Sequence, residues 1–291
     1  METLQFKRKI FEQLDFKVLK NIFLTFGDGS KGWRDAQKRI TREAKKSEAF
    51  DGSFGFDDRW LKSWDSNLFL KLESYKKRFG PRGHGYWLWK PAIMMWADSL
   101  FPSHRIIYVD AGSHFNFDSN HWTKDFGDWL ELSTKEGVLA WQLPHNRDRD
   151  WCKKELVNYL EPSEKHLSTG QVQSGFIIMS PTTSRRQFLS EWLNTMLKKD
   201  GQLVNDHLLD EQELSFIENR HDQSIFSLLW KKYNFPLLID QSDPKLNPKS
   251  PILAVRNNTG LTWGASRTKI NFYSRRNSVI DLVINLINKI R

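Results

Sequence analysis

The chain has 291 residues, a formal net charge of +9 and a pI near 9.5, with 39% hydrophobic and 27% charged residues. This composition is ordinary for a globular protein, and the length suits one large α/β domain or two small ones. The single cysteine, Cys152, excludes an internal disulfide framework and a cysteine-based zinc site, so we expect a reducing compartment such as the cytoplasm.

Targeting signals, membrane-spanning segments and net charge further limit the kinds of function that we expect. Residues 1–16 are mixed and charged and lack an apolar core, so we expect no signal peptide. No run of about 18 apolar residues occurs, so we expect no membrane-spanning helix. The positive charge suits phosphate-bearing ligands, anionic lipid or nucleic acid, but it is spread along the chain, and we expect no nucleic-acid partner.

Predicted strands and helices alternate along the chain, beginning with an apolar strand that runs into a Gly-Asp-Gly-Ser turn. The predicted strands are residues 21–26, 105–109, 138–143, 173–180 and 237–239. The predicted helices are residues 32–47, 59–78, 91–100, 150–160, 186–197 and 221–233, and the glycine-rich residues 80–85 are expected to form a flexible loop. This alternation predicts an α/β fold with a mostly parallel sheet between two layers of helices.

We expect a single domain over residues 1–291, with its core at about residues 20–240. Residues 240–250 contain two prolines and read as a loop, which lies too near the C-terminus to bound a second domain. Residues 241–291 are therefore expected to form a C-terminal loop and an amphipathic helix. The apolar residues of 278–290 have helical spacing. That helix either packs on the domain or makes a peripheral contact with a membrane surface.

Asp110 follows Arg105–Val109, a short run that is apolar after Arg105, where a buried strand opens into a loop. Ligands of open α/β sheets lie beyond the carboxyl ends of the strands. A carboxylate at this place suits Mg²⁺ or Mn²⁺, and such a cation can hold a diphosphate. The alternative is that Asp110 only caps the turn at the end of the strand. Lys90 lies one helix earlier in the chain.

The pattern Gly-Tyr-Trp-Leu-Trp-Lys-Pro at residues 85–91, followed by a helix and then Ile-Ile-Tyr-Val-Asp-Ala-Gly at residues 106–112, resembles a group of bacterial and viral glycosyltransferase-like proteins tied to polysaccharide synthesis. Its layout is similar to the wider GT-A class of glycosyltransferases. In that class a strand ends in an Asp-x-Asp motif that binds a metal ion and the donor diphosphate. Asp110 matches the first Asp of the motif, whereas position 112 is Gly.

The resemblance implies a GT-A-like, Rossmann-like fold and a donor site built around Asp110. Asp110 would hold Mn²⁺ or Mg²⁺ with a distant partner, for which His221 is the candidate, or would bind ribose, or the site would work without metal. The resemblance places donor-binding residues at Thr25, Phe26, Gly27, Arg39, Tyr86, Trp87, Lys90, Asp110, Ala111, Gly112, Gln173, Ser174, Gly175 and Gln223.

Within this set, the end of the first strand (residues 25–27) would touch the nucleotide base, and Arg39 would contact phosphate or lie on the surface. Tyr86 and Trp87 would stack on the sugar or base, or fill the core. Lys90 would offset diphosphate charge or would be solvated. Gln173 would bond sugar hydroxyls, and Gly175 would let the backbone approach the ligand closely.

Asp222 lies at the start of the predicted helix over residues 221–233 and resembles the acidic residue that acts as general base toward the acceptor in inverting members of the class. The alternative is a helix N-cap, because Asp at a helix start bonds the first free amides. The sequence therefore predicts a transferase that uses a UDP- or GDP-type sugar donor and a glycan or glycoconjugate acceptor. The rival function is a non-catalytic carbohydrate- or nucleotide-sugar-binding protein on the same fold.

Overall fold

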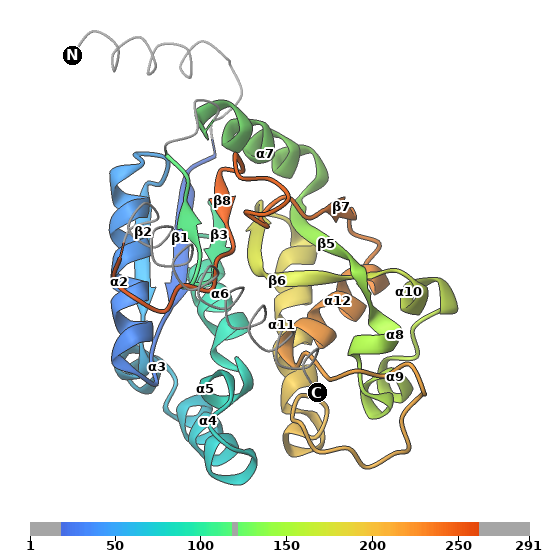
Figure 1. Cartoon of the computed structure of the whole chain (residues 1–291). Coiled ribbons are helices and arrows are strands. Elements are labelled where there is room, and N and C mark those ends of the chain that lie inside the picture. The colour runs from blue at the N-terminus through green and yellow to red at the C-terminus, as the bar shows by residue number, and fades with distance from the viewer. Residues whose placement is uncertain (1–18, 118–121, 262–291) are drawn as a thin grey trace, which may run out of the picture.

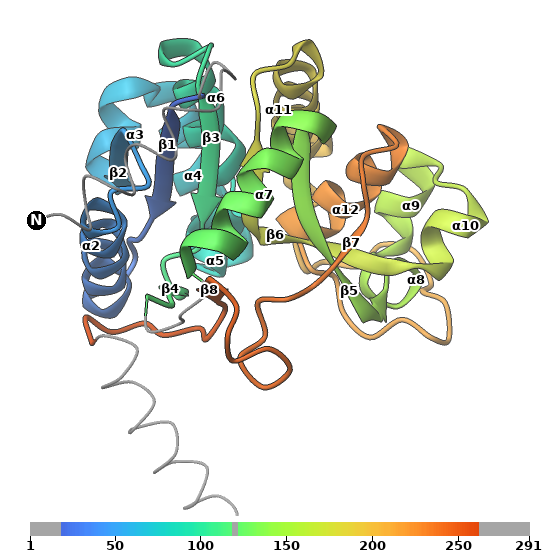
Figure 2. The same cartoon turned by 90° about the horizontal axis from the view of Figure 1, so that it is seen from above.

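The computed structural model describes residues 19–117 and 122–261, in which a six-stranded sheet lies between two layers of helices (Figures 1 and 2). The strand order is β2-β1-β3-β6-β5-β7. The strands are β1 (Asn21–Phe26), β2 (Gly52–Phe56), β3 (Arg105–Val109), β5 (Val138–Arg147), β6 (Gly170–Met179) and β7 (Leu238–Ile239). A separate pair joins β4 (His114–Phe115) to β8 (Ile252–Leu253).

Five of the six strands of the main sheet run in one direction. β1 is parallel to β2 and β3, and β5 is parallel to β7, while β6 is antiparallel to both β3 and β5. The predicted α/β fold with a mostly parallel sheet covered on both faces is therefore confirmed. The reversal of β6 needs no crossover helix, because an antiparallel neighbour can be reached by a local connection.

Each face of the sheet has its own apolar core, and Figure 2 shows from above the helices that lie on the two faces. The helices on one face are α3 (Asp58–Trp64), α4 (Ser66–Phe79), α6 (Trp89–Leu100), α11 (Thr183–Leu197) and α12 (Asp222–Lys232). The other face carries α2 (Lys31–Lys46) and α7 (Trp122–Glu136). Every residue of β3 is buried, because helices cover it on both sides, and this is why the strand is apolar from Ile106 to Val109.

Short elements complete the fold, namely α5 (Gly83–Tyr86), α8 (Asp148–Trp151), α9 (Lys154–Leu160), α10 (Glu164–Ser168) and the 3₁₀ turn at Lys198–Gly201. The predicted helix over residues 59–78 is two helices. It breaks at Asp65, whose backbone is extended and whose side chain caps α4 by accepting from the Leu68 amide. β2 and α7 were not predicted, since two glycines interrupt the β2 pattern.

The chain after β7 returns to the sheet and crosses the loop that follows β3. β8 pairs with β4, and the Asn257 amide donates to the Gly112 carbonyl at 2.8 Å. The predicted C-terminal loop thus helps to fix the loop after Asp110. The helix predicted at residues 278–290 lies outside the described residues, and the single-domain organisation stays a prediction. None of the described helices is long and apolar enough to cross a membrane.

Candidate functional site

Lys90, Asp110, Ser174 and Asp222 meet at one place, although they come from four different elements. The Lys90 ammonium lies 3.3 Å from Asp110 Oδ1 and 2.9 Å from Asp222 Oδ2. It also donates to Ser174 Oγ at 3.2 Å, and that hydroxyl donates to Asp222 Oδ2 at 2.8 Å. The fold therefore gathers four of the predicted site residues into one cluster. Asp222 does not turn back onto its own helix as a simple N-cap would; its bonds go to Lys90 and Ser174.

The cluster is buried at one end and open at the other. The side chains of Lys90 and Asp222 are 2% and 5% exposed, whereas that of Asp110 is 42% exposed. Among the described residues, no hydrogen-bond partner contacts Asp222 Oδ1 or Asp110 Oδ2. Each carboxylate thus keeps one oxygen that can accept a bond from a ligand.

Burial and charge oppose each other in the cluster. Burial lowers the pKa of Lys90, but Asp110 and Asp222 together raise it above its usual value, so the ammonium stays charged. Burial raises the pKa of Asp222, and Lys90 and Ser174 offset this only in part. Asp222 therefore takes up a proton more readily than an exposed aspartate does.

Tyr108 belongs to the cluster and was missed by sequence reasoning. Its hydroxyl donates to Asp110 Oδ1, and its ring centroid lies 5.2 Å from the Lys90 ammonium. Burial raises the pKa of Tyr108 well above its usual value, so it acts here as a donor. Alternation along β3 could have found it, because residues two apart on a strand project from the same face.

Two unusual backbone segments support the cluster. Residues 83–87 all have positive φ, and so does His221, at 55°. Trp87 stacks on the His221 ring with centroids 5.4 Å apart, and Tyr86 meets it edge-on at 5.2 Å. Left-handed backbone at non-glycine residues is costly and concentrates at functional sites. The glycine-rich stretch expected as a flexible loop is thus a defined left-handed turn that leads into α6 and Lys90.

His221 does not share a ligand position with Asp110. Its Nδ1 is 2.9 Å from the Val204 carbonyl, its Nε2 lies 3.5 Å from Asp206 Oδ1, and burial lowers its pKa. Within residues 19–117 and 122–261, no group of three or more His, Cys, Asp or Glu side chains could hold a metal ion. The residues fit a cation held by Asp110 together with a bound diphosphate, since Mg²⁺ commonly binds one or two carboxylates plus substrate phosphates.

Position 112 explains why the second Asp of an Asp-x-Asp motif does not fit. A Cβ at Gly112 would lie 3.1 Å from the Arg256 Cα, because the returning C-terminal segment crosses there. A carboxylate side chain would push that segment away.

Arg39 has a different position from the predicted phosphate contact. Its guanidinium is 2% exposed and donates to the carbonyls of Ala111 at 2.8 Å, Ser113 at 2.9 Å and Thr259 at 3.3 Å. It also pairs with Glu43 at 3.1 Å. Its donors therefore hold the loop after Asp110, including Ala111, in place. Sequence reasoning could not find these partners, because they lie far away along the chain.

The end of β1 packs inside the fold. Thr25 is fully buried, and its hydroxyl has no partner among the described residues. Phe26 stacks on Trp89 with ring centroids 4.1 Å apart. A Cβ at Gly27 would come within 2.3 Å of the Trp33 carbonyl, so this glycine allows α2 to approach β1. Contact of these residues with a nucleotide base stays a prediction.

The remaining predicted residues lie on β6 and α12. Gly175 is next to the cluster: a Cβ there would lie 2.9 Å from Asp110 Oδ2. Gln173 donates to Asp240 at 2.6 Å, and Gln223 donates to Gln171 at 2.7 Å. These two amides are thus engaged with neighbouring side chains, while Gly175 leaves the outer oxygen of Asp110 accessible.

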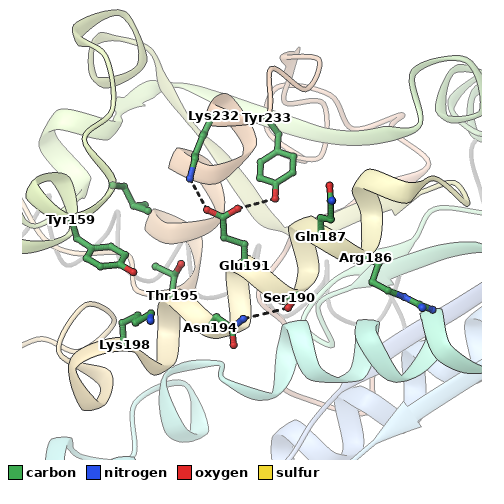
Figure 3. Close-up of a pocket in the computed structure, with 11 residues that line it drawn as sticks. Tyr159, Arg186, Gln187, Ser190, Glu191, Asn194, Thr195, Lys198, Lys232 and Tyr233 are labelled. Carbon is green, nitrogen blue, oxygen red and sulfur yellow. Dashed lines mark hydrogen bonds and ion pairs between the residues drawn. The ribbon is translucent and has the colours of Figure 1, made fainter.

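A pocket of about 870 Å³ lies elsewhere, between α9, α11 and the end of α12 (Figure 3). Glu191 accepts from Lys232 at 2.7 Å and from the Tyr233 hydroxyl at 2.8 Å inside it. None of the predicted site residues lines this pocket. This pocket is therefore separate from the Lys90 cluster.

Comparison with known proteins gives distant likenesses only. No protein-family model matches the chain, and no curated protein matches its sequence. The structure of mouse xyloside xylosyltransferase 1 in its apo form is similar with a TM-score of 0.38 and 12% identity, over 76% of this chain and 85% of that one. A glycosyltransferase involved in the glycosylation of the major capsid of PBCV-1 is similar with a TM-score of 0.36 and 8% identity, over 62% and 68%. Likenesses this distant assign no activity to the chain.

Proposed function

We propose that the protein is a glycosyltransferase that moves a sugar from a nucleoside-diphosphate donor to a hydroxyl group of a glycan or glycoconjugate acceptor. The observation that carries the proposal is the Lys90–Asp110–Asp222 cluster, with one free oxygen on each carboxylate. The resemblance of residues 85–91 and 106–112 to glycosyltransferase-like proteins of polysaccharide synthesis supports it. A cytoplasmic location belongs to the same proposal.

In the proposed reaction, Asp222 acts as general base through Oδ1. It takes the proton of the acceptor hydroxyl as that oxygen attacks the anomeric carbon of the donor sugar. The new bond joins the acceptor oxygen to the anomeric carbon, and the bond to the diphosphate oxygen breaks, so the nucleoside diphosphate leaves with the bonding electrons. This single displacement inverts the anomeric configuration.

The net charge of the Lys90 cluster determines which ligand can bind beside Asp110, at the exposed end of the cluster. Lys90 brings one positive charge against two carboxylates, so a diphosphate alone would meet net negative charge. Asp110 would hold Mn²⁺ or Mg²⁺ only together with the donor phosphates, and the cation would neutralise their charge. Lys90 keeps Asp222 in place and ionised while the donor binds.

We expect UDP or GDP to bind at least about tenfold more tightly with Mn²⁺ than without it. Mn²⁺ alone should give no measurable binding heat, because Asp110 is the only exposed carboxylate that the Lys90 cluster offers. Isothermal titration calorimetry measures all three combinations. Absence of binding for every nucleoside diphosphate at millimolar concentration with Mn²⁺ would refute the proposal. The non-catalytic rival predicts binding without release of nucleoside diphosphate from any sugar donor.

Gly175→Ala should weaken binding of the nucleotide with Mn²⁺ by about tenfold, because the new methyl group would lie 2.9 Å from Asp110 Oδ2 and force that carboxylate to turn. Stability should change by less than about 1 kcal/mol. Gly127→Ala is the matched control, since a Cβ there meets nothing within 4 Å. Unchanged affinity in Gly175→Ala would place the ligand away from Asp110.

A further inference from the structure

Within residues 19–117 and 122–261, the main sheet has one edge that is unpaired and long enough to accept another strand. β2 lies at that edge, next to β1, as Figure 1 shows. The opposite edge strand, β7, has only two residues. A groove of about 580 Å³ runs along β2. Exposed edge strands present unpaired backbone groups that a further strand can bond.

The backbone N–H and C=O groups of Ser53 and Gly55 point away from β1, beyond the edge of the sheet. The Gly27 amide donates to the Phe56 carbonyl, and Phe26 is in register with Phe56. In a parallel pair, alternate residues bond the neighbour, so residues 52, 54 and 56 face β1, and residues 53 and 55 face outward. Gly55 is exposed, and a Cβ there would collide with the Gln37 side chain. No side chain of residue 55 therefore covers the backbone at this point.

The two walls of the groove differ in chemistry. On one face of the sheet, Lys38, Arg42 and Lys45 lie along a single side of α2. All three are exposed, and none forms an ion pair with another described residue. Asp51 and Asp57 lie at the two ends of β2.

The other wall is aromatic. Phe54 and Trp60 pack around Trp96, with ring centroids 5.4 and 5.5 Å from it, and all three line the groove while remaining partly exposed. These rings belong to the core on the face opposite α2. A strand added to β2 would therefore place successive side chains alternately against cations and against aromatic rings.

We propose that the edge of β2 binds an extended peptide segment of a partner protein in which acidic and apolar residues alternate. Backbone bonds to Ser53 and Gly55 would supply affinity. The alternation would supply specificity, as is usual when a strand is added to a sheet edge. The cations of α2 repel basic segments and select acidic ones. This surface is separate from the Lys90 cluster, so the proposal stands independently of the transferase activity.

The test uses the full-length chain and a blocked seven-residue peptide that alternates Glu and Val, with binding followed by calorimetry. A peptide of the same composition with its Glu and Val residues in separate blocks should bind at least about tenfold more weakly. An alternating peptide whose backbone amides are N-methylated on the edge that would bond to β2 should also bind at least about tenfold more weakly. Arg42→Glu/Lys45→Glu should lose at least about tenfold in affinity. The matched pair Lys77→Glu/Lys165→Glu, with the same charge change at exposed sites elsewhere, should keep it.

Three results would overturn the proposal. The first is no binding of the alternating peptide at millimolar concentration. The second is equal binding of the block peptide or of Arg42→Glu/Lys45→Glu, which would indicate unspecific attraction to a basic protein. The third is binding of an oligouronate in the groove without binding of the peptide, which would make the surface a site for an anionic glycan.

Discussion

Asp222→Asn is expected to reduce turnover by about 10²-fold or more while the protein stays folded and still binds nucleotide with Mn²⁺. Asparagine keeps the size of the side chain but cannot take the proton of the acceptor hydroxyl. Lys90 retains Asp110 as an ionic partner, so its buried ammonium is still paired with a carboxylate. The measurement is release of nucleoside diphosphate from a panel of UDP- and GDP-sugars with a glycan acceptor.

Asp240→Asn is the matched control, since Asp240 accepts from Gln173 near the site but has no part in proton transfer. It should keep turnover within a few-fold of the unaltered protein. The pH profile gives a second readout. Because burial raises the pKa of Asp222, and the base works only when deprotonated, turnover should fall on the acid side at a pH above the usual range for aspartate. Near-normal turnover in Asp222→Asn would end the assignment.

Lys90→Met is expected to lower the free energy of unfolding by about 3–5 kcal/mol and to abolish turnover. The substitution leaves the buried Asp222 carboxylate without its cation, and Asp222 is 5% exposed. Its pKa should then rise further, so a larger fraction of the base would be protonated at a given pH. Urea denaturation at unchanged m-value measures the stability loss.

Two variants separate charge from packing in this experiment. Adding Asp222→Asn to Lys90→Met removes the unpaired carboxylate and should restore most of the stability, but not the turnover. Lys77→Met, at an exposed lysine without an ion pair among the described residues, should change stability by no more than about 0.5 kcal/mol. If Lys90→Met unfolds at the same urea concentration as the unaltered protein, Lys90 does not hold the two carboxylates together.

The sequence by itself determined the order of most of the main elements, but not β2 or α7, and it placed Asp110 at the end of a buried strand. Ile106–Val109 is a continuous apolar run, which predicts a strand covered on both faces, and Asp110 follows it at the carboxyl end. Helical spacing placed Asp222 at the start of α12. These inferences succeed because apolar periodicity reports local structure and burial directly.

Local patterns failed where the pattern was weak or the backbone unusual. β2 carries two glycines in five residues, which removes the β-branched signal of a strand. The stretch at residues 83–87 has a loop-like composition, yet packing against His221 fixes it in a left-handed turn. Composition cannot report this, because the contacts that offset the cost of such a backbone come from distant residues.

Only the tertiary structure decided which side chains meet. It put the Lys90 ammonium between Asp110 and Asp222 and added Tyr108 to them. It also engaged Arg39 with loop carbonyls instead of leaving it for a ligand. The physical reason is that hydrogen bonds and ion pairs between distant segments depend on how helices pack on the two faces of the sheet. Spacing along the chain gives no measure of that packing.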